Sequence, residues 1–301
     1  MILFCQGDIM DDFHSKADLH IHSKYSGIMK YMGLKFPDSV EEPKNIMKHA
    51  QKKDLSVIAI TDHNTIKGGL ETKKLEKECG IDVIVGSEIM TKDGEIIGLF
   101  LNEEIPKFLS SEETIERIHE QGGLAIAPHP YSPICHAVGD KIFKLKLDGV
   151  EVFNAYHRDG IVNNIALKKV MKNYHKRPVA FIGNSDGHLA KMVGNGYTMF
   201  EGNSADDLYD AIVKRKTSFG GSPTSLIDII LWSYSVVYVS EKTILKSMVF
   251  KNSLDIALHK KLLAVFGGLI YMATPLPIVS GILGNIYLKR KARGKLKEVS
   301  I

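Results

Sequence analysis

The sequence predicts an α/β fold in which a (β/α) barrel is followed by a helical extension. Short apolar runs rich in Val and Ile alternate with helical segments up to Gly221, which is typical of parallel strands joined by crossover helices. About seven such strands suit a closed barrel better than an open sheet. Beyond Gly221 the composition changes, so we expect two domains, residues 1–221 and residues 222–301.

The composition is that of an ordinary globular protein, with 44% hydrophobic and 25% charged residues, and it supplies enough apolar material for a core. The net charge of +4 is mild and does not indicate a nucleic-acid groove. Cys5, Cys79 and Cys135 are scattered without a C-x-x-C spacing, which is typical of reduced thiols in an intracellular protein. The N-terminus has no basic region before an apolar core, so we expect no secretory signal and a cytoplasmic catalytic domain.

The first half of the chain alternates strands with helices. Val and Ile content and apolar spacing predict strands at 17–22, 55–60, 81–85 and 96–101, and helices at 39–53 and 66–79. Gly80 follows the second helix and is expected to end it as a C′ residue. Asp93-Gly94 predicts a hairpin turn into the last of these strands.

The second half repeats this alternation. The same signals predict helices at 111–121, 161–174 and 204–216, and strands at 124–127, 149–153, 179–182 and 197–200. Gly122-Gly123 ends the first of these helices. We find no exact internal repeat in the sequence, and the rhythm of strand, loop and helix is what the two halves share.

The first strand carries the motif around which the chain is organised. His20 and His22 lie two residues apart, and residues i and i+2 of a strand point to the same face. Histidine is a common metal ligand, so this pair supplies half of a coordination shell.

Further residues of the same chemical types follow the ends of later strands. These residues are His63, Glu88, His129, Asp186 and His188. The carboxyl ends of barrel strands lie on one face, and that face carries the active site in (β/α) barrels. The placement therefore predicts that these side chains converge on one site together with His20 and His22.

Imidazoles and carboxylates together bind divalent ions such as Zn²⁺, Mn²⁺ or Fe²⁺. A carboxylate between two imidazole groups can bridge two ions, and a pair of ions can activate a water and hold phosphoryl oxygens. Asp18 and Asp62 stand next to candidate ligands. We expect them to orient His20 and His63 through the second ring nitrogen of each imidazole.

These motifs resemble those of the PHP (polymerase and histidinol phosphatase) family, in the family's order, over about residues 16–221. The segments that carry the resemblance are Asp18–Ser23, Ile60–Thr65, Gly86–Glu88, His129-Pro130 and Ser185–His188. The resemblance implies a distorted seven-stranded barrel with two or three metal ions and phosphoester hydrolysis.

The resemblance also implies roles for the individual residues. His20, His22, Glu88 and Asp186 would hold the first metal, and Glu88 would bridge to a second metal that His129 also binds. His63 and His188 would bind a third metal or assist the leaving group as catalytic residues.

The sequence departs from the family pattern at two positions. Many members have an acid five residues after the second histidine, where this chain has Gly27, so we expect a third metal site that is empty or weak. Many related phosphatases have a histidine in the strand after the bridging glutamate, where this chain has Glu95. Glu95 could bind the second metal or be a solvated hairpin residue.

Other candidates have a functional and a structural reading. Cys135 or His136 could reach the metals, and Asn154 could contact substrate or cap its strand. Four residues lie in loops expected at the open end of the barrel: Lys24, Tyr25, His157 and Arg158. They could bind a phosphate, or they could be solvated loop residues without a role in binding. By their positions in helices and loops, we expect surface exposure for His14, His49, His119, His136, His157, His175 and His259.

The C-terminal extension contains two apolar segments. Residues 226–239 suit a packed or amphipathic helix, whereas residues 262–288 carry no charge and are long enough to cross a bilayer. Pro275 and Pro277 would kink that segment, so we expect a transmembrane or re-entrant membrane segment. The alternative is a soluble helical hairpin that turns at 274–277 and packs on the barrel.

The function that follows is a metal-dependent phosphoesterase. A hydroxide held between the metals would attack a phosphomonoester or nucleotide-type substrate, with His63 or His188 assisting the leaving oxygen. Expected partners are a phosphorylated small molecule, a nucleotide or short oligonucleotide, and a membrane; no feature indicates a protein partner. Gly27 favours the alternative of a non-hydrolytic binding module localised by its C-terminal segment, and amide hydrolysis on a similar barrel is a third reading.

Overall fold

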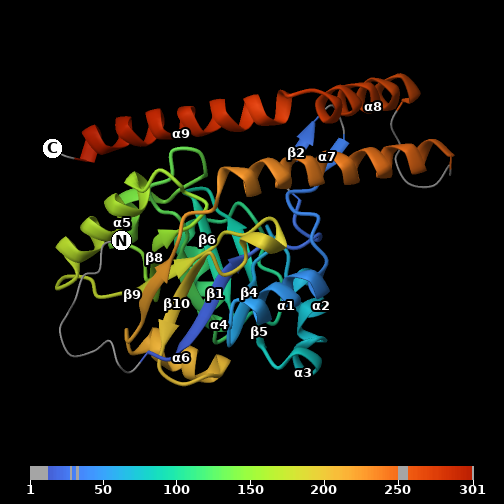
Figure 1. Ribbon diagram of the computed structural model, residues 1–301. Helices are drawn as coiled ribbons and strands as arrows, with labels where there is room; N and C mark the ends of the chain where they lie inside the picture. Colours follow the sequence, from blue (N-terminus) through green and yellow to red (C-terminus); the bar gives the residue numbers. More distant parts are fainter. Residues whose placement is uncertain (1–12, 28, 32–33, 250–256, 300–301) are drawn as a thin grey trace.

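The protein is described by a computed structural model that covers residues 13–27, 29–31, 34–249 and 257–299. Its main sheet has nine strands in the order β11-β10-β1-β4-β5-β6-β7-β8-β9. These strands curl into a barrel whose outer surface is covered by helices (Figure 1). The main strands are β1 (Ser15–Ile21), β4 (Val57–Ile60), β5 (Asp82–Met90), β6 (Glu95–Leu99), β7 (Leu124–Ala127), β8 (Gly149–Asn154), β9 (Ala180–Asn184), β10 (Gly196–Phe200) and β11 (Ser218–Gly221).

The helices and a small hairpin complete the fold. β2 (Met29–Tyr31) and β3 (Leu34–Phe36) form a separate two-stranded sheet after β1. The α-helices are α1 (Pro43–Lys52), α2 (Lys67–Lys73), α3 (Glu76–Cys79), α4 (Ser111–Glu120), α5 (Ile161–Asn173), α6 (Ala205–Val213), α7 (Leu226–Val249), α8 (Leu258–Ala273) and α9 (Leu276–Val299). Two 3₁₀ helices are η1 (Gly139–Phe143) and η2 (Ala190–Met192). The expected helix at 66–79 is therefore broken into α2 and α3, and α3 ends at Gly80, which adopts the left-handed conformation.

The sheet mixes parallel and antiparallel pairs. β1 pairs in parallel with β4, β4 with β5, β7 with β8, and β8 with β9, as the strand–helix rhythm predicts. β6 lies antiparallel to both β5 and β7, because the predicted turn at Asp93-Gly94 returns the chain beside β5 without a crossover helix. β10 and β11 add a second antiparallel section beside β1. The hairpin expected at Asp93-Gly94 is therefore confirmed, whereas the antiparallel pairing of β10 with β1 and β11 was not part of the prediction.

Side-chain hydrogen bonds close the barrel between its first and last strands. The Thr198 hydroxyl on β10 accepts from the Gly183 backbone N–H at 3.1 Å and donates to the Gly183 carbonyl at 2.9 Å. The Asn184 side chain on β9 accepts from the Leu19 N–H at 2.8 Å. The edge strand β9 is therefore tied to β10 and β1 through buried polar groups, which stabilises the end of the barrel that carries the candidate site.

A bulge in β1 aims the organising histidines. Asp18 pairs with Ile58 of β4, and Ile21 pairs with Ile60. Between these two pairs β1 therefore has one residue more than β4, which is a β-bulge. Before the bulge, Ala17 and Leu19 pack into one apolar cluster, whereas Ile21 packs into a different one on the far side of the sheet. The bulge therefore turns His20 and His22 to the side that Ala17 and Leu19 occupy lower on the strand.

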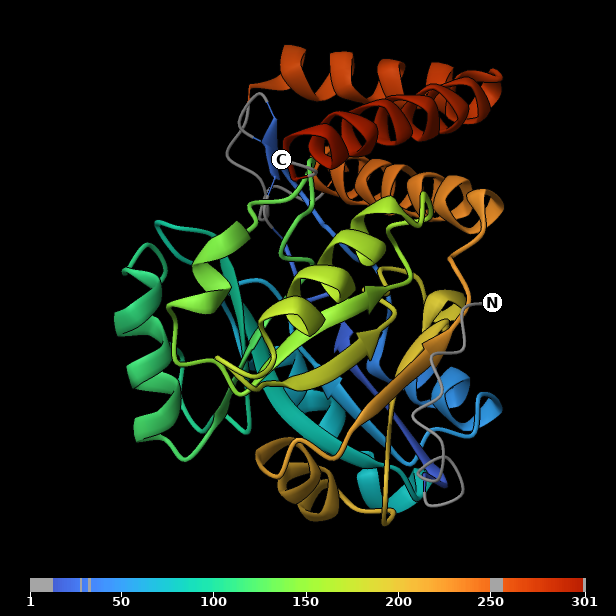
Figure 2. The ribbon, with the colours of Figure 1, turned by 90° about the vertical axis from the view of Figure 1, so that its left-hand side faces the viewer.

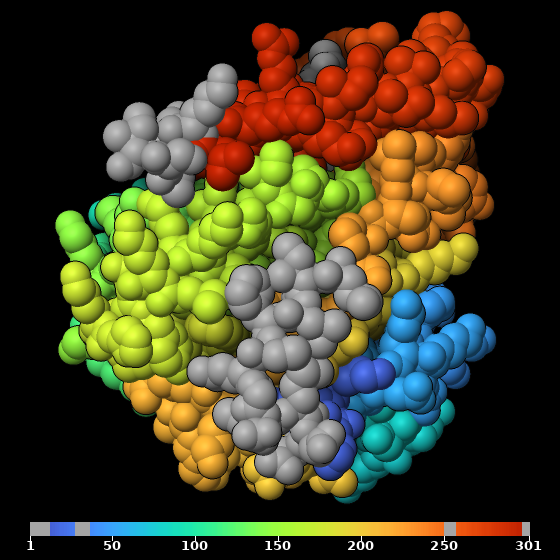
Figure 3. Space-filling model, turned by 60° about the vertical axis from the view of Figure 1, so that its left-hand side comes forward, coloured from blue at the N-terminus to red at the C-terminus, as the bar shows by residue number. Residues whose placement is uncertain are grey.

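The C-terminal helices lie at the end of the barrel opposite α6, as Figures 1 and 2 both show. α8 packs on α7, and α9 packs on both α7 and α5. Figure 3 shows α9, in red, lying on the yellow-green surface that includes α5. The helix expected at 226–239 continues to Val249 as α7.

The apolar segment expected at 262–288 is divided at Thr274-Pro275 into α8 and α9. The two helices meet at an angle of 81°, which is neither a straight span nor a hairpin. Proline lacks the backbone N–H that a continuous helix needs, and this accounts for the break. Within the described residues, no single helix is long and apolar enough to cross a membrane, although α8 and α9 as a bent pair meet the criteria of length and composition.

Candidate metal-binding site

Four of the sequence-predicted ligands meet at the carboxyl ends of β1, β5 and β9. His20 Nε2 lies 3.3 Å from Glu88 Oε2 and 3.6 Å from Asp186 Oδ1. His22 Nε2 lies 3.5 Å from each of the same two oxygens. His20, His22 and Asp186 bring their donor atoms within 4.8 Å of one another, close enough to share one ion.

Glu88 connects this group to a second one. Its Oε1 lies 3.0 Å from His129 Nε2, while its Oε2 faces His20, His22 and also His63 Nδ1 at 3.2 Å. His20, Glu88 and His129 form a second set of donors that a single ion could join. The two carboxylate oxygens thus contact different imidazoles, an arrangement that suits a bridging ligand.

A third group forms around Asp38, which the sequence reading missed. Asp38 Oδ2 lies 3.0 Å from His188 Nε2 and 3.6 Å from His63 Nε2. It also lies 3.7 Å from His22 Nδ1, and these four residues bring their donor atoms within reach of one ion. Asp38 therefore supplies to this group a carboxylate that Gly27 cannot, while the expectation that the third site is empty or weak stays a prediction.

No short spacing marks Asp38 in the sequence. It follows the β2–β3 hairpin and returns to the mouth of the barrel, where the Trp232 indole N–H of α7 donates to its backbone carbonyl at 2.8 Å. Its position depends on the path of an inserted hairpin and on a helix of the C-terminal extension. A reading of local motifs could not have found it.

Glu95 belongs to the cluster and is not a solvated hairpin residue. It is 5% exposed, and its oxygens lie 4.0 Å from His63 Nδ1 and 3.9 Å from His129 Nε2. Burial, together with the negative charge of Glu88, raises the pKa of Glu95 to about 8. Its donor atom lies within reach of the same position as those of His63 and Glu88.

His157 is fully buried, so its expected place on the surface is wrong. Its ring lies 5.9 Å from the ring of His129, and both of its nitrogens are without a hydrogen-bond partner in the described part of the chain. His129, His157 and Cys135 form a further set, whose donor atoms lie within 4.8 Å of one another. Cys135 is therefore the member of the 135–136 pair that reaches the cluster, whereas the His136 side chain is exposed.

The buried nitrogens of the cluster fit a set of cations. Among the described residues, hydrogen-bond partners are missing for His20 Nε2, His22 Nε2, His63 Nδ1, His129 Nδ1 and both nitrogens of His157. Buried polar atoms without partners are costly, and imidazole nitrogens that face several carboxylates are the ligand set of divalent ions such as zinc or manganese. The residues present therefore suit the metal ions that the sequence predicts.

Electrostatics keep the central carboxylates charged. Burial alone would raise the pKa values of Glu88 and Asp186, but neighbouring imidazoles, His20 first among them, lower both well below their usual range. Burial, and then the nearby His188, lowers the pKa of His22 to about 4. The same carboxylates raise the pKa of His20 well above its usual value and that of His129 to about 9, so a metal that binds these imidazoles would displace their protons.

Glu151 orients the ligands, a role that was expected of Asp18. Glu151 Oε1 lies 3.1 Å from His20 Nδ1 and accepts from the Asn184 side chain at 2.9 Å. Its Oε2 accepts from the His129 backbone N–H at 2.6 Å and from the Asn154 side chain at 2.9 Å. One buried carboxylate thus joins β1, β8, β9 and the loop after β7.

Asp18 and Asp62 hold backbone segments and do not contact the rings they were expected to orient. The Asp18 carboxylate accepts from the backbone N–H groups of Ser185 at 3.0 Å and Gly194 at 2.8 Å. The Asp62 carboxylate accepts from the backbone N–H and the hydroxyl of Ser23, each at 2.6 Å. Both therefore fix the loops that carry ligands.

The substrate candidates divide into three cases. Asn154 is buried and its side chain donates to Glu151 and Asp186, so it positions ligands and is not available to contact a substrate. Lys24 pairs with the exposed Glu42 at 2.7 Å and lies over the Tyr25 ring. Arg158 lines a cavity that opens beside the cluster.

Backbone strain occurs at two of the ligands. His129 has a φ of 26° and Asp186 a φ of 52°, in the left-handed region that residues with side chains seldom adopt. Such conformations persist only where surrounding contacts enforce them, and they concentrate at functional sites. The hydrogen bond from the His129 N–H to Glu151 is one of those contacts.

Comparisons with known proteins bear on the same site. A family model described as PHP-associated matches residues 164–217. An uncharacterised protein of Methanocaldococcus jannaschii is 78% identical over 157 residues, 52% of this chain and 92% of that protein. A 5'-3' exoribonuclease of Haemophilus influenzae is 29% identical over 192 residues, 62% of this chain and 59% of the enzyme.

A solved structure shares the fold. It is that of a two-domain protein from Bacteroides vulgatus containing a predicted PHP-like metal-dependent phosphoesterase, with a TM-score of 0.56 and 18% identity. The alignment covers 72% of this chain and 68% of that one.

Proposed function

Because the chain belongs to the PHP family of metal-dependent phosphoesterases, we propose that it hydrolyses a phosphate ester at the cluster around Glu88. The observation that carries this proposal is the Glu88 carboxylate, whose two oxygens face imidazole groups on opposite sides. His20, His22, Asp186 and Glu88 would hold one ion, and His129 and Glu88, with Glu95, a second.

A third ion would be held by Asp38 with three of the histidines. When bound, the ions would lower the pKa of a water molecule and stabilise the negative charge that develops on the phosphoryl oxygens. The members of this third group are His22, Asp38, His63 and His188. Asp38 provides an acid where Gly27 cannot, which supports the hydrolytic function over a non-hydrolytic binding module.

The chain's own residues would bind and orient the ester. The side chains of His63 and His188 are 8% and 10% exposed, whereas those of His20 and His22 are fully buried. His63 and His188 therefore face the side from which a substrate arrives, and either could donate a proton to the leaving oxygen. The substrate classes that suit such a site are a phosphomonoester or a nucleotide, and the name of the Haemophilus relative supports including short oligonucleotides among them.

The C-terminal helices would bring this site to an anionic lipid surface. Their exposed apolar residues are Leu258, Leu262, Leu263, Phe266, Leu269, Ile270, Leu276, Ile278, Val279, Ile282, Leu283, Ile286 and Tyr287. An apolar surface of this extent is typical of a partner- or membrane-binding face. The exposed basic residues that follow, Lys289, Arg290, Lys291 and Arg293, complement anionic head groups and make a bilayer the favoured partner.

Hydrolysis of simple esters tests the proposed reaction. The purified full chain is incubated with Mn²⁺, Zn²⁺ or Fe²⁺ and an aryl phosphomonoester or diester, and phosphate or phenol release is measured. We expect hydrolysis of at least one ester class. Asp186→Ala should lower the rate of hydrolysis at least about a hundredfold, because Asp186 is the carboxylate that faces both His20 and His22 in the first donor group. Metal binding without turnover of either ester would refute a general phosphoesterase.

A further inference from the structure

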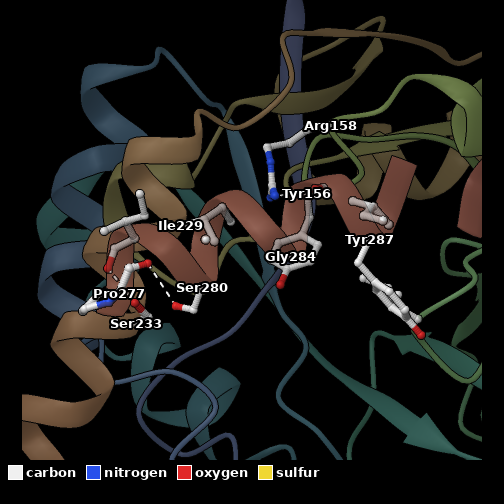
Figure 4. A pocket seen from close by; sticks show the side chains of 12 residues that line it. Tyr156, Arg158, Ile229, Ser233, Pro277, Ser280, Gly284 and Tyr287 are labelled. Carbon is white, nitrogen blue, oxygen red and sulfur yellow. Dashed lines mark hydrogen bonds between the residues drawn. The ribbon is translucent and has the colours of Figure 1, made fainter. Parts of the chain in front are cut away.

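A cavity of about 280 Å³ lies between α7, α9 and the loops at the mouth of the barrel. Figure 4 shows its lining, in which Tyr156 and Arg158 stand beside Gly284 of α9 and Ile229 lies on α7. Apolar and small side chains make up most of the wall. The cavity therefore depends on the C-terminal helices and is not a feature of the barrel alone.

Aromatic residues connect this cavity to the candidate metal cluster. The Tyr156 ring, which lines the cavity, lies 5.6 Å from the ring of His188. Trp232 of α7 packs edge-on against Tyr156 at 6.3 Å and lies 5.2 Å from the His188 ring. The end of the cavity near Tyr156 is thus one side chain away from the third donor group.

The polar groups of the lining are largely satisfied within the protein. The Ser233 hydroxyl donates to the Ile230 carbonyl at 2.8 Å and accepts from the Tyr271 hydroxyl at 3.2 Å. The Ser280 hydroxyl donates to the Pro277 carbonyl at 3.0 Å. A nucleobase needs hydrogen-bonding partners that match its edge, and these hydroxyls are already engaged, so the wall is better suited to a hydrocarbon.

Arg158 supplies positive charge to the cavity wall beside Tyr156. Its guanidinium lies 5.9 Å from the centre of the Tyr156 ring, and its Nε is buried without a hydrogen-bond partner in the described part of the chain. An arginine in this state is a ready donor for a phosphate or carboxylate oxygen. The cavity therefore combines an apolar wall with one cationic group that can bind an anion.

We propose that this cavity binds the apolar chain of an amphiphilic phosphate ester, whose phosphate lies at the metal cluster on the other side of Tyr156. The inference rests on the proposed phosphoesterase function and names its substrate class. In the reaction, a water oxygen bonds to phosphorus, the P–O bond to the alkyl oxygen breaks, and that oxygen takes a proton. The products are inorganic phosphate and a long-chain alcohol.

The two sides of α9 support a lipid source for such a substrate. Leu288 and Ala292 are buried on its inner side, and Leu288 lines the cavity. On the other side, Leu283 and Ile286 are 59% and 57% exposed. Apolar residues of α9 therefore lie both on its exposed side, where a bilayer would contact it, and on the side that lines the cavity.

Chain-length preference tests the inference. Phosphate release from n-butyl phosphate and n-decyl phosphate is measured with the metal-loaded full chain, with the decyl ester both dissolved and in phosphatidylcholine vesicles. Burial of the additional methylene groups should raise kcat/KM for the decyl ester at least about tenfold over the butyl ester. Faster release from vesicles than from solution would support the bilayer as the source.

A cavity-filling variant provides the matched test. A Cβ at Gly284 meets no heavy atom within 4 Å, so Gly284→Phe can be accommodated and projects into the cavity. It should lower kcat/KM for the decyl ester at least tenfold more than for the butyl ester. Gly294→Phe is the control, since Gly294 is equally open, lies on the same helix and is not part of this cavity lining.

A second measurement guards against misfolding of the variant. Decylphosphonate should inhibit aryl phosphate hydrolysis by the unaltered protein at least tenfold more strongly than butylphosphonate. Equal rates for the two alkyl esters and equal inhibition by the two phosphonates would overturn the inference. A strong preference for a nucleoside monophosphate over the decyl ester would also overturn it. In both cases phosphate release would leave the phosphoesterase proposal intact, whereas no hydrolysis of any ester would refute that proposal itself.

Discussion

At the scale of single residues, Glu151 determines how the candidate ligands are held. It accepts hydrogen bonds from the His129 backbone and from Asn154 and Asn184, and it contacts the His20 ring. A buried carboxylate with this many partners fixes both the orientation of His20 and the strained backbone at His129.

Replacement of Glu151 should weaken metal binding without removing a ligand. In Glu151→Gln an NH₂ group replaces one carboxylate oxygen and faces the N–H groups that this oxygen accepted from. The ligands are then held less firmly, and we expect metal affinity to fall by about 10–100-fold. Calorimetric titration with Mn²⁺ measures the change, and excess Mn²⁺ should restore part of the hydrolytic activity. Glu113→Gln, in an exposed pair with Arg117, is the control. Equal affinities of Glu151→Gln and the control would contradict the role.

Sequence reasoning found the residues whose motifs stand at strand ends and missed those that tertiary structure delivers. His20, His22, Glu88, His129 and Asp186 converge because parallel strands end on one face. Asp38 follows the β2–β3 hairpin in the sequence, and His157 is a buried residue of the loop after β8. Their positions depend on long-range packing, which local spacing does not encode.

At the scale of elements, two departures from regular alternation shape the site. The β1 bulge turns its histidines inward, and the β5–β6 hairpin brings Glu95 beside Glu88. The turn at Asp93-Gly94 was readable from the sequence, whereas the bulge was not, because its residues carry no turn signal. The sequence therefore predicted the barrel and its β5–β6 hairpin, but not the antiparallel pairing of β10 with β1 and β11.

The exposed side of α9 is expected to bind the lipid surface, so a charge placed there should weaken binding to vesicles. Leu283→Asp should reduce binding of the full chain to anionic vesicles by about tenfold or more, because it places a charge where an apolar side chain would enter the bilayer. Vesicle flotation measures the bound fraction. Thermal stability should change little, since Leu283 is 59% exposed.

A comparable exposed leucine on the barrel serves as the control. Leu70 on α2 is 46% exposed, and Leu70→Asp should leave flotation unchanged. If the unaltered protein does not float with anionic vesicles, or if both variants float as it does, the helices do not act as a lipid-binding surface.

At the scale of the whole molecule, the barrel and the extension contribute to one site. The barrel supplies the cluster, α7 covers it through Trp232, and α9 completes the adjoining cavity. The sequence indicated both parts separately. Their contact could not be predicted, because it depends on how α7 and α9 pack against the mouth loops and α5.

The measurement that tests the central claim most directly is activity as a function of bound metal. The full chain is stripped with a chelator and titrated with Mn²⁺, while bound manganese and aryl phosphate hydrolysis are followed together. We expect hydrolysis to rise as the groups around Glu88 fill, three ions to bind at saturation, and one ion fewer in Asp38→Asn with reduced activity. Hydrolysis that is independent of bound metal, or saturation with metal without hydrolysis, would contradict the account.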